Sequence, residues 1–191
     1  MVEHFVHTEG VVGSNPIPTT IYSLRLSRME MRCVLKRQLH ASVEMLRQSV
    51  ENCPDEVWLS GEHPRNYWRI FYHAAAFAHL YLYDNLESWA KWPKHDLSRT
   101  YLEGDVPISE PYSRAEALEF VDLIQSEIDD RIDAMDLDAP SCGFTWYPKV
   151  SRFELIILSM RHLHGHLGQL NEILIADGRD IKWLGQLNSA N

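Results

Sequence analysis

Residues 151–176 read SRFELIILSMRHLHGHLGQLNEILIA, and this stretch has the pattern of a long amphipathic helix. Ser151 and Glu154 have the spacing of a capping box at a helix N-terminus. His162 and His166 are four residues apart, so their side chains lie on one face of the helix, one turn apart. We predict that this face is directed toward the core, together with other residues at the same spacing: Leu155, Ser159, Gln169 and Ile173.

Three further segments show helical periodicity, at about 28–52, 64–84 and 113–135. The first and third of these segments also begin with capping boxes, formed by Ser27 with Glu30 and by Ser113 with Glu116. The segments between the helices lose the period and are rich in proline, glycine and aromatic residues, chiefly at 85–112 and 138–149. Four long helices without a convincing strand predict an all-α fold, a four-helix bundle with long loops between helices.

The composition restricts the class of protein. The chain has 191 residues, which suits one domain, and a formal net charge of -9 from 18 basic and 27 acidic side chains. An acidic surface repels phosphate backbones, so we expect no nucleic-acid partner. Three cysteines cannot form a complete disulfide framework, and the chain shows neither a secretory signal nor a membrane-spanning run. We therefore expect a cytoplasmic protein with no membrane partner.

Residues 1–26 differ from the rest because glycine and proline break any helical period. Two interpretations of this segment stay open. It is either an ordinary flexible N-terminal arm or the translated end of a neighbouring transfer RNA gene, because Gly13-Ser14-Asn15-Pro16 can be encoded by the T-arm sequence of such genes. In both cases we expect the bundle domain to span 27–191.

His73 adds a third histidine to the pair on the last helix. It lies between Ile70 and Phe77 on the inner stripe of the second predicted helix. Three imidazoles in one core need polar partners, and a shared metal ion would satisfy all three. The alternative is three core histidines satisfied by local hydrogen bonds. Two other histidines lie off these stripes: we expect His79 to face the surface or a loop, and His164 to leave its helix on a different face.

No other catalytic pattern competes. The chain lacks HExxH, GxSxG, GxGxxG and P-loop motifs, and it lacks the Glu-x-x-His spacing of di-iron bundles. Aromatic residues gather in the two long loops: Trp89, Trp92, Tyr101, Trp146 and Tyr147. We expect them to pack against the end of the bundle, with the lining of a substrate mouth as the alternative.

Several motifs resemble the DinB-like family. They include WRIFYHA at 68–74, EPYS at 110–113, Arg161-His162 with His166 and GQLN at 168–171, and Trp183. The resemblance implies a metal-binding four-helix bundle with His73, His162 and His166 as ligands of a divalent transition metal: Zn, Ni, Mn or Fe. It also implies a homodimer. Gly165 departs from the family, where relatives often carry a second histidine, and this alters the rim of the site.

Characterised members of that family include bacillithiol S-transferases and a mycothiol-dependent maleylpyruvate isomerase. The resemblance therefore implies an enzyme that activates a low-molecular-weight thiol, with a small-molecule substrate. Three histidines leave coordination positions open, as in catalytic rather than structural sites. Two alternatives remain: a metal-dependent hydrolase that uses metal-bound water with the same ligands, and a non-catalytic metal-binding dimeric bundle.

Overall fold

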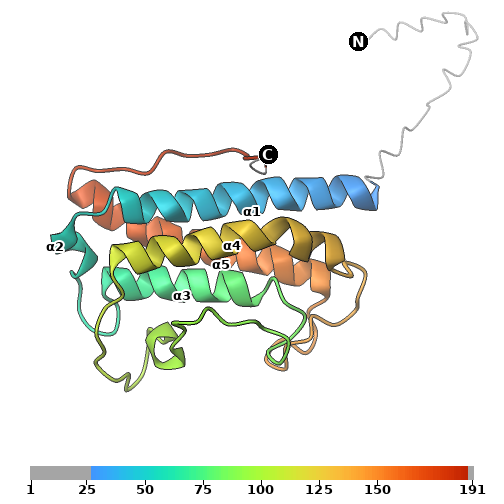
Figure 1. Cartoon of the computed structure of the whole chain (residues 1–191), viewed down its shortest axis with the longest axis horizontal. Helices are drawn as coiled ribbons and strands as arrows, with labels where there is room; N and C mark the ends of the chain where they lie inside the picture. The colour runs from blue at the N-terminus through green and yellow to red at the C-terminus, as the bar shows by residue number, and fades with distance from the viewer. Residues whose placement is uncertain (1–26, 189–191) are drawn as a thin grey trace, which may run out of the picture.

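The structure is a computed structural model that describes residues 27–188, and this part of the chain is all-helical, as predicted (Figure 1). It contains no strand. The helices are α1 (Arg28–Glu51), α2 (Asp55–Trp58), α3 (Tyr67–Leu80), the 3-10 helix η1 (Leu97–Thr100), α4 (Arg114–Ala134) and α5 (Arg152–Ala176). No helix in this part of the chain is long and apolar enough to cross a membrane. The predictions for residues 1–26 lie outside the described residues.

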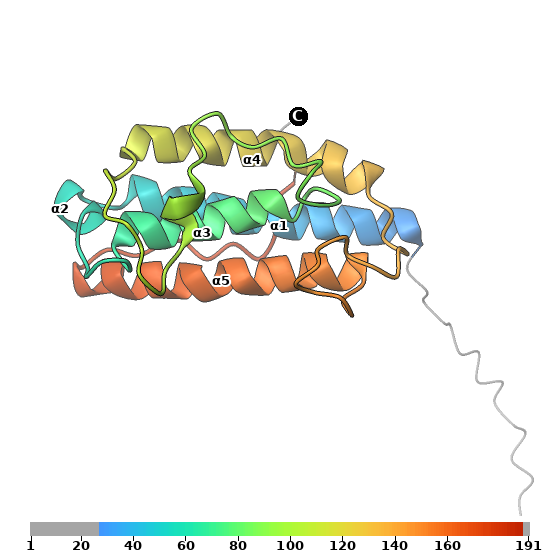
Figure 2. The same ribbon diagram turned by 90° about the horizontal axis from the view of Figure 1, so that it is seen from below.

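The four long helices lie side by side around one hydrophobic core. Helices α1 and α3 each contact both α4 and α5, so α4 and α5 flank α3 when the molecule is viewed from below (Figure 2). Figure 1 shows α3 and α4 running in the same direction, with α1 and α5 running in the opposite one. Because α3 and α4 are parallel, their connection must return along the length of the helices, which explains why it is long.

The predicted capping boxes are present at all three positions. Ser27, Ser113 and Ser151 each accept a hydrogen bond from the backbone of the glutamate three residues on, which in turn accepts one from the serine backbone. Hydrogen bonds with the side chain and the backbone of the capping serine lower the pKa of Glu154, and the same two contacts, the backbone one foremost, lower the pKa of Glu30 and of Glu116. Each serine therefore sets the first turn of its helix, and local sequence decides where α1, α4 and α5 begin.

Helix α3 is shorter than predicted. It begins at Tyr67 rather than near Pro64, because the preceding residues form a turn in which the Tyr67 N–H donates to the Ser60 carbonyl at 3.0 Å. It ends at Leu80 rather than at Asp84, and the chain continues in turns. Helix α2 was not predicted, since four residues are too few to show a helical period.

A buried arginine attaches the α3–α4 connection to α3. Arg69 is 0% exposed, and its guanidinium donates to the Ser98 carbonyl at 3.0 Å and to Oγ of Ser109 at 2.8 Å. A buried cation needs such acceptors, because an unpaired one would cost several kcal/mol. These bonds hold η1 against α3, and Figure 2 shows η1 crossing in front of that helix. Thr100, the last residue of η1, is thereby fixed beside His73.

Candidate metal centre

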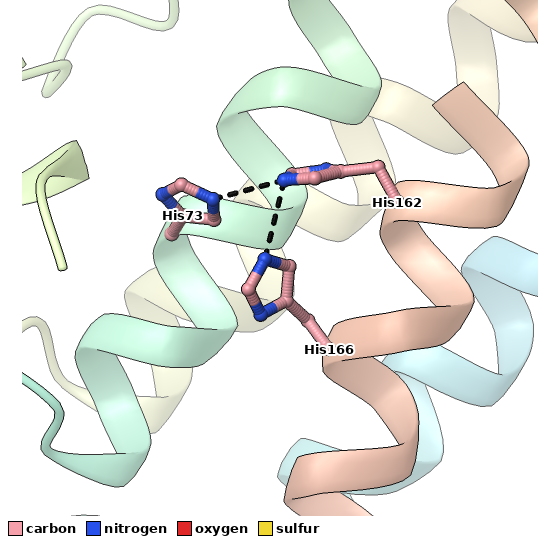
Figure 3. A group of neighbouring side chains, drawn as sticks. All are labelled: His73, His162 and His166. Atoms are coloured by element: carbon pink, nitrogen blue, oxygen red, sulfur yellow. Dashed lines mark hydrogen bonds between the residues drawn. The ribbon is translucent and has the colours of Figure 1, made fainter. Parts of the chain in front are cut away.

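The structure brings His73, His162 and His166 together, with their Nε2 atoms facing one another (Figure 3). Nε2 of His162 lies 3.0 Å from Nε2 of His73 and 3.2 Å from Nε2 of His166. His73 comes from α3 and the other two from α5, 89 residues later in the case of His162. Contact between α3 and α5 therefore completes a group of three side chains that could hold a metal ion.

The partners of the outer ring nitrogens decide the tautomers of two of these histidines. Nδ1 of His73 lies 2.6 Å from the carbonyl oxygen of Thr100, which can only accept, so Nδ1 carries the proton. Nδ1 of His166 lies 3.0 Å from Oε1 of Gln169. Arg65 also donates to that atom, at 3.2 Å, which identifies it as the amide oxygen. Both Nε2 atoms therefore present a lone pair to the centre of the group.

This arrangement fits a divalent transition metal. Two lone pairs and the Nε2 of His162 converge within a few ångströms, and three neutral imidazoles are a common donor set for zinc, nickel and iron. Without a metal, Nε2 of His162 carries at most one proton, while Nε2 of His73 and Nε2 of His166 are both acceptors. That proton can make a hydrogen bond to one of them, and the lone pair of the other is then left without a donor. A backbone carbonyl or an amide behind the histidine is a typical orienting partner in metal sites.

Burial keeps the three imidazoles neutral. It lowers the pKa of His73 and of His162 to about 4, with neighbouring imidazoles adding to the effect. The pKa of His166 is also lowered, by burial and by the charge of Arg65, although the hydrogen bond that its Nδ1–H donates to Gln169 raises it. Metal ligation requires the unprotonated ring, so the folded chain presents these side chains in the required state near pH 7.

The cluster lies at the rim of the core, which corrects the prediction that these histidines face the bundle interior. The buried side of α5 is offset by one position from the predicted stripe, and His162 and His166 are only partly buried beside it. That buried side comprises Leu155, Ile156, Ser159, Leu163, Leu167, Leu170 and Leu174. Two of these buried leucines, Leu163 and Leu167, each come directly after a histidine of the cluster. The imidazoles of His162 and His166 therefore lie beside the core, between α3, α5 and the α3–α4 connection.

His79 was predicted to face the surface or a loop. It is 0% exposed, so the surface alternative is wrong, but it does face a loop, because it contacts Trp89 in the α3–α4 connection. Trp89 donates its indole N–H to Nδ1 of His79 at 3.1 Å, and Nε2 lies 3.3 Å from the carboxylate of Glu127 on α4. His79 thus joins α3 to α4 and to the α3–α4 connection, which carries Trp89. Periodicity alone could not show this, because α3 is buried on several sides.

His164 leaves α5 on a different face from the cluster, as predicted. Its Nε2 lies 2.9 Å from Oγ of Ser42 on α1, and its ring packs near Trp183. It therefore attaches α5 to α1 and to the C-terminal segment.

A cavity of about 310 Å³ borders the cluster and is lined in part by His73 and His166. Two charged side chains also line it, Arg65 and Glu103. Sequence reasoning did not identify Arg65, Glu103 or the roles of Thr100 and Gln169. Gln169 could have been found from its position three residues after His166. A backbone carbonyl such as that of Thr100 leaves no signal in a sequence.

The cysteines do not offer a competing nucleophile at this site. Cys53 and Cys142 are buried, and burial raises the pKa of Cys53 to about 11. Cys33 is exposed on α1 and is not among the residues that line the histidine cavity.

Protein-family models, curated proteins and solved structures were all compared with this chain, and none of them matches it.

Proposed function

We propose that this chain is a metal-dependent enzyme of the DinB-like type, which transfers a low-molecular-weight thiol to an electrophile. The observation that supports this most strongly is the convergence of three Nε2 atoms, two of them held as lone-pair donors by Thr100 and Gln169. The proposal is further supported by the four long helices, with one histidine on α3 and two on α5, since the resemblance implies ligands from two helices of such a set. The resemblance also supports a homodimer.

His73, His162 and His166 would hold the metal. A divalent transition metal bound there would lower the pKa of a coordinated thiol and so supply a nucleophile near pH 7. Three protein ligands leave coordination positions open, and the neighbouring cavity gives a small molecule access to them. A closed structural site would have four protein ligands and no such cavity.

Of the two charged residues of the cavity, Arg65 has a role in this proposal. Arg65 places a positive charge beside the imidazoles, and this charge attracts an anionic thiol and opposes protonation of His73 and His166. Glu103 is exposed and supplies the one carboxylate of the lining, and the proton that the thiol loses passes to solvent. In the reaction a sulfur–carbon bond forms, the bond from carbon to the leaving group breaks, and the leaving group departs with the electron pair.

A thiol-transfer assay tests the proposal. Metal-free protein is loaded with Zn²⁺, Ni²⁺, Mn²⁺ or Fe²⁺ and mixed with cysteine and 1-chloro-2,4-dinitrobenzene, and the thioether is followed by its absorbance while chloride is released. We expect one of the metals to raise the rate above that of the metal-free protein. His73→Ala should abolish the increase, because one ligand is lost, and His164→Ala should retain it.

Two results would contradict the proposal. If no metal raises the rate above that of the metal-free protein, the alternative of a non-catalytic metal-binding bundle is favoured instead. Metal-dependent hydrolysis of p-nitrophenyl acetate without any thiol dependence would instead indicate a hydrolase that uses the same three histidines.

A further inference from the structure

A second cavity, of about 460 Å³, lies beside the histidine cavity. Its floor is formed by α3 and its walls by two loops and η1. We call it the aromatic chamber and define it by six of its lining residues: Leu80, Leu86, Trp89, Leu97, Trp146 and Tyr147. The volume falls in the range that binds small organic molecules, which is roughly 300–1,000 Å³.

The aromatic chamber carries no formal charge. Its lining contains no aspartate, glutamate, lysine or arginine. His95 is the one histidine in the lining, and burial together with the nearby Lys91 lowers its pKa, so the imidazole is neutral near pH 7. Burial raises the pKa of Tyr81, which keeps that phenol neutral as well. A charged ligand would lose its hydration here without gaining a partner, whereas an uncharged apolar group would be stabilised.

The two cavities share part of their lining. Phe77, Thr100 and Tyr101 border both of them. Phe77 also packs against the ring of His73, with ring centroids 4.8 Å apart, and against that of His162 at 5.4 Å. A molecule bound in the aromatic chamber is therefore adjacent to the histidine group, with the ring of Phe77 in contact with both.

The walls of the aromatic chamber are held in place independently of any ligand. Trp89 is fixed by its hydrogen bond to His79. The loop that carries Trp146 and Tyr147 is held at its base by Arg152, which donates to the Tyr83 carbonyl at 2.8 Å. A preformed apolar site loses less conformational entropy on binding than one that must fold around its ligand.

From this juxtaposition we propose that the aromatic chamber binds the uncharged, apolar body of the substrate, preferentially an aromatic one, while the reacting group lies in the histidine cavity. That the bound molecule is a substrate rests on the proposed function. Binding of an apolar ligand in the chamber needs neither a metal nor a reaction, so it can be tested separately.

The test uses N-phenyl-1-naphthylamine, an uncharged aromatic probe whose fluorescence rises in apolar surroundings. It is titrated into the metal-free full-length chain in the presence of a chelator. Leu97→Asp and Leu86→Asp each place a carboxylate at the chamber, at positions that are 59% and 49% exposed and so tolerate a charge in the folded state. Ile108→Asp is the matched control, since Ile108 is an 88% exposed loop residue outside the lining.

We expect saturable binding of the probe to the unmodified chain, and an increase in Kd of tenfold or more in both chamber variants. Ile108→Asp should leave Kd unchanged, and thermal melting of all three variants shows whether they remain folded. Absence of saturable binding overturns the inference, as does binding that is equally strong in the folded chamber variants. If the probe binds as expected but thiol transfer fails in the assay above, the proposed function is wrong and the apolar binding site stands.

Discussion

Gln169 holds His166 in the tautomer that a metal ligand needs. The two side chains are one turn apart on α5, and the amide oxygen that faces Nδ1 of His166 at 3.0 Å is identified by the second donor on it, Arg65. Gln169 is itself exposed, so this contact contributes little to the core. It can therefore be removed with little effect on folding.

Gln169→Leu should weaken metal affinity about 10- to 100-fold, because His166 loses the acceptor that orients its ring and fixes its proton. Calorimetric titration of the metal-free protein with Zn²⁺ measures this. Gln186→Leu makes the same change at an exposed position of the C-terminal segment and should leave the affinity unchanged. Equal affinities for the two variants would show that the amide does not orient the ligand.

His73→Ala, His162→Ala and His166→Ala should each release most of the metal, since each removes one of three donors. His164→Ala should retain it, because His164 contacts Ser42 and Trp183 instead. The metal content of each variant is measured after equilibration with limiting zinc. The ligand assignment is wrong if His164→Ala empties the site or if His73→Ala leaves its occupancy unchanged.

Stability should fall as the pH drops below about 6.5, in part because of His79. Burial lowers the pKa of His79 in the folded chain, against the raising effect of Glu127, while Arg131 and His95 lower it further. The folded chain thus binds fewer protons than the unfolded one, whose histidine titrates near 6.5. The stabilising contribution is complete above that pH and is lost as the pH falls toward the folded pKa.

Urea unfolding of the metal-free protein at pH 7.5 and 5.5 measures this loss, with His79→Gln as the comparison. The variant should lose less of its free energy of unfolding between the two pH values than the unmodified chain does. An equal loss in both would mean that His79 does not contribute to the acid sensitivity.

Gly143→Ala should destabilise the chain by about 3 kcal/mol or more. Gly143 has a φ of +82°, and an added Cβ would overlap the carbonyl oxygen of Asp84. Gly104 has a similar φ of +84° with open space around it, so Gly104→Ala should show only the backbone strain, about 1–2 kcal/mol. Free energies of unfolding from urea titration give the loss in each variant. Equal losses would mean that the close contact with the Asp84 carbonyl adds nothing to the cost of the substitution.

Deletion of residues 1–26 should leave the melting temperature nearly unchanged. The first helix begins with its own cap, in which Ser27 and Glu30 exchange hydrogen bonds, so the helix does not need the preceding segment to define its start. Differential scanning calorimetry of the full chain and of the shortened chain checks this. A clear drop in melting temperature would show that the segment contributes to the folded core.

The sequence by itself determined the features that depend on residues close together in the chain. Ser113 with Glu116 sets the start of α4 through a contact over three residues. The four-residue spacing of His162 and His166 likewise places both imidazoles on one face of α5. Such local geometry follows from the pitch of a helix and the hydrogen bonds of its first turn, whatever the rest of the chain does.

Only the tertiary structure decided how His73 meets that pair and what surrounds it. The packing of α3 on α5 brings the three Nε2 atoms together. The hydrogen bond from Arg69 to η1 holds the α3–α4 connection in place, so the Thr100 carbonyl lies beside His73. The same packing buries His79, because α3 is covered by α4 and by the α3–α4 connection as well as by α5. These contacts join segments far apart in the chain, so they depend on how whole helices fill one core, which no local spacing encodes.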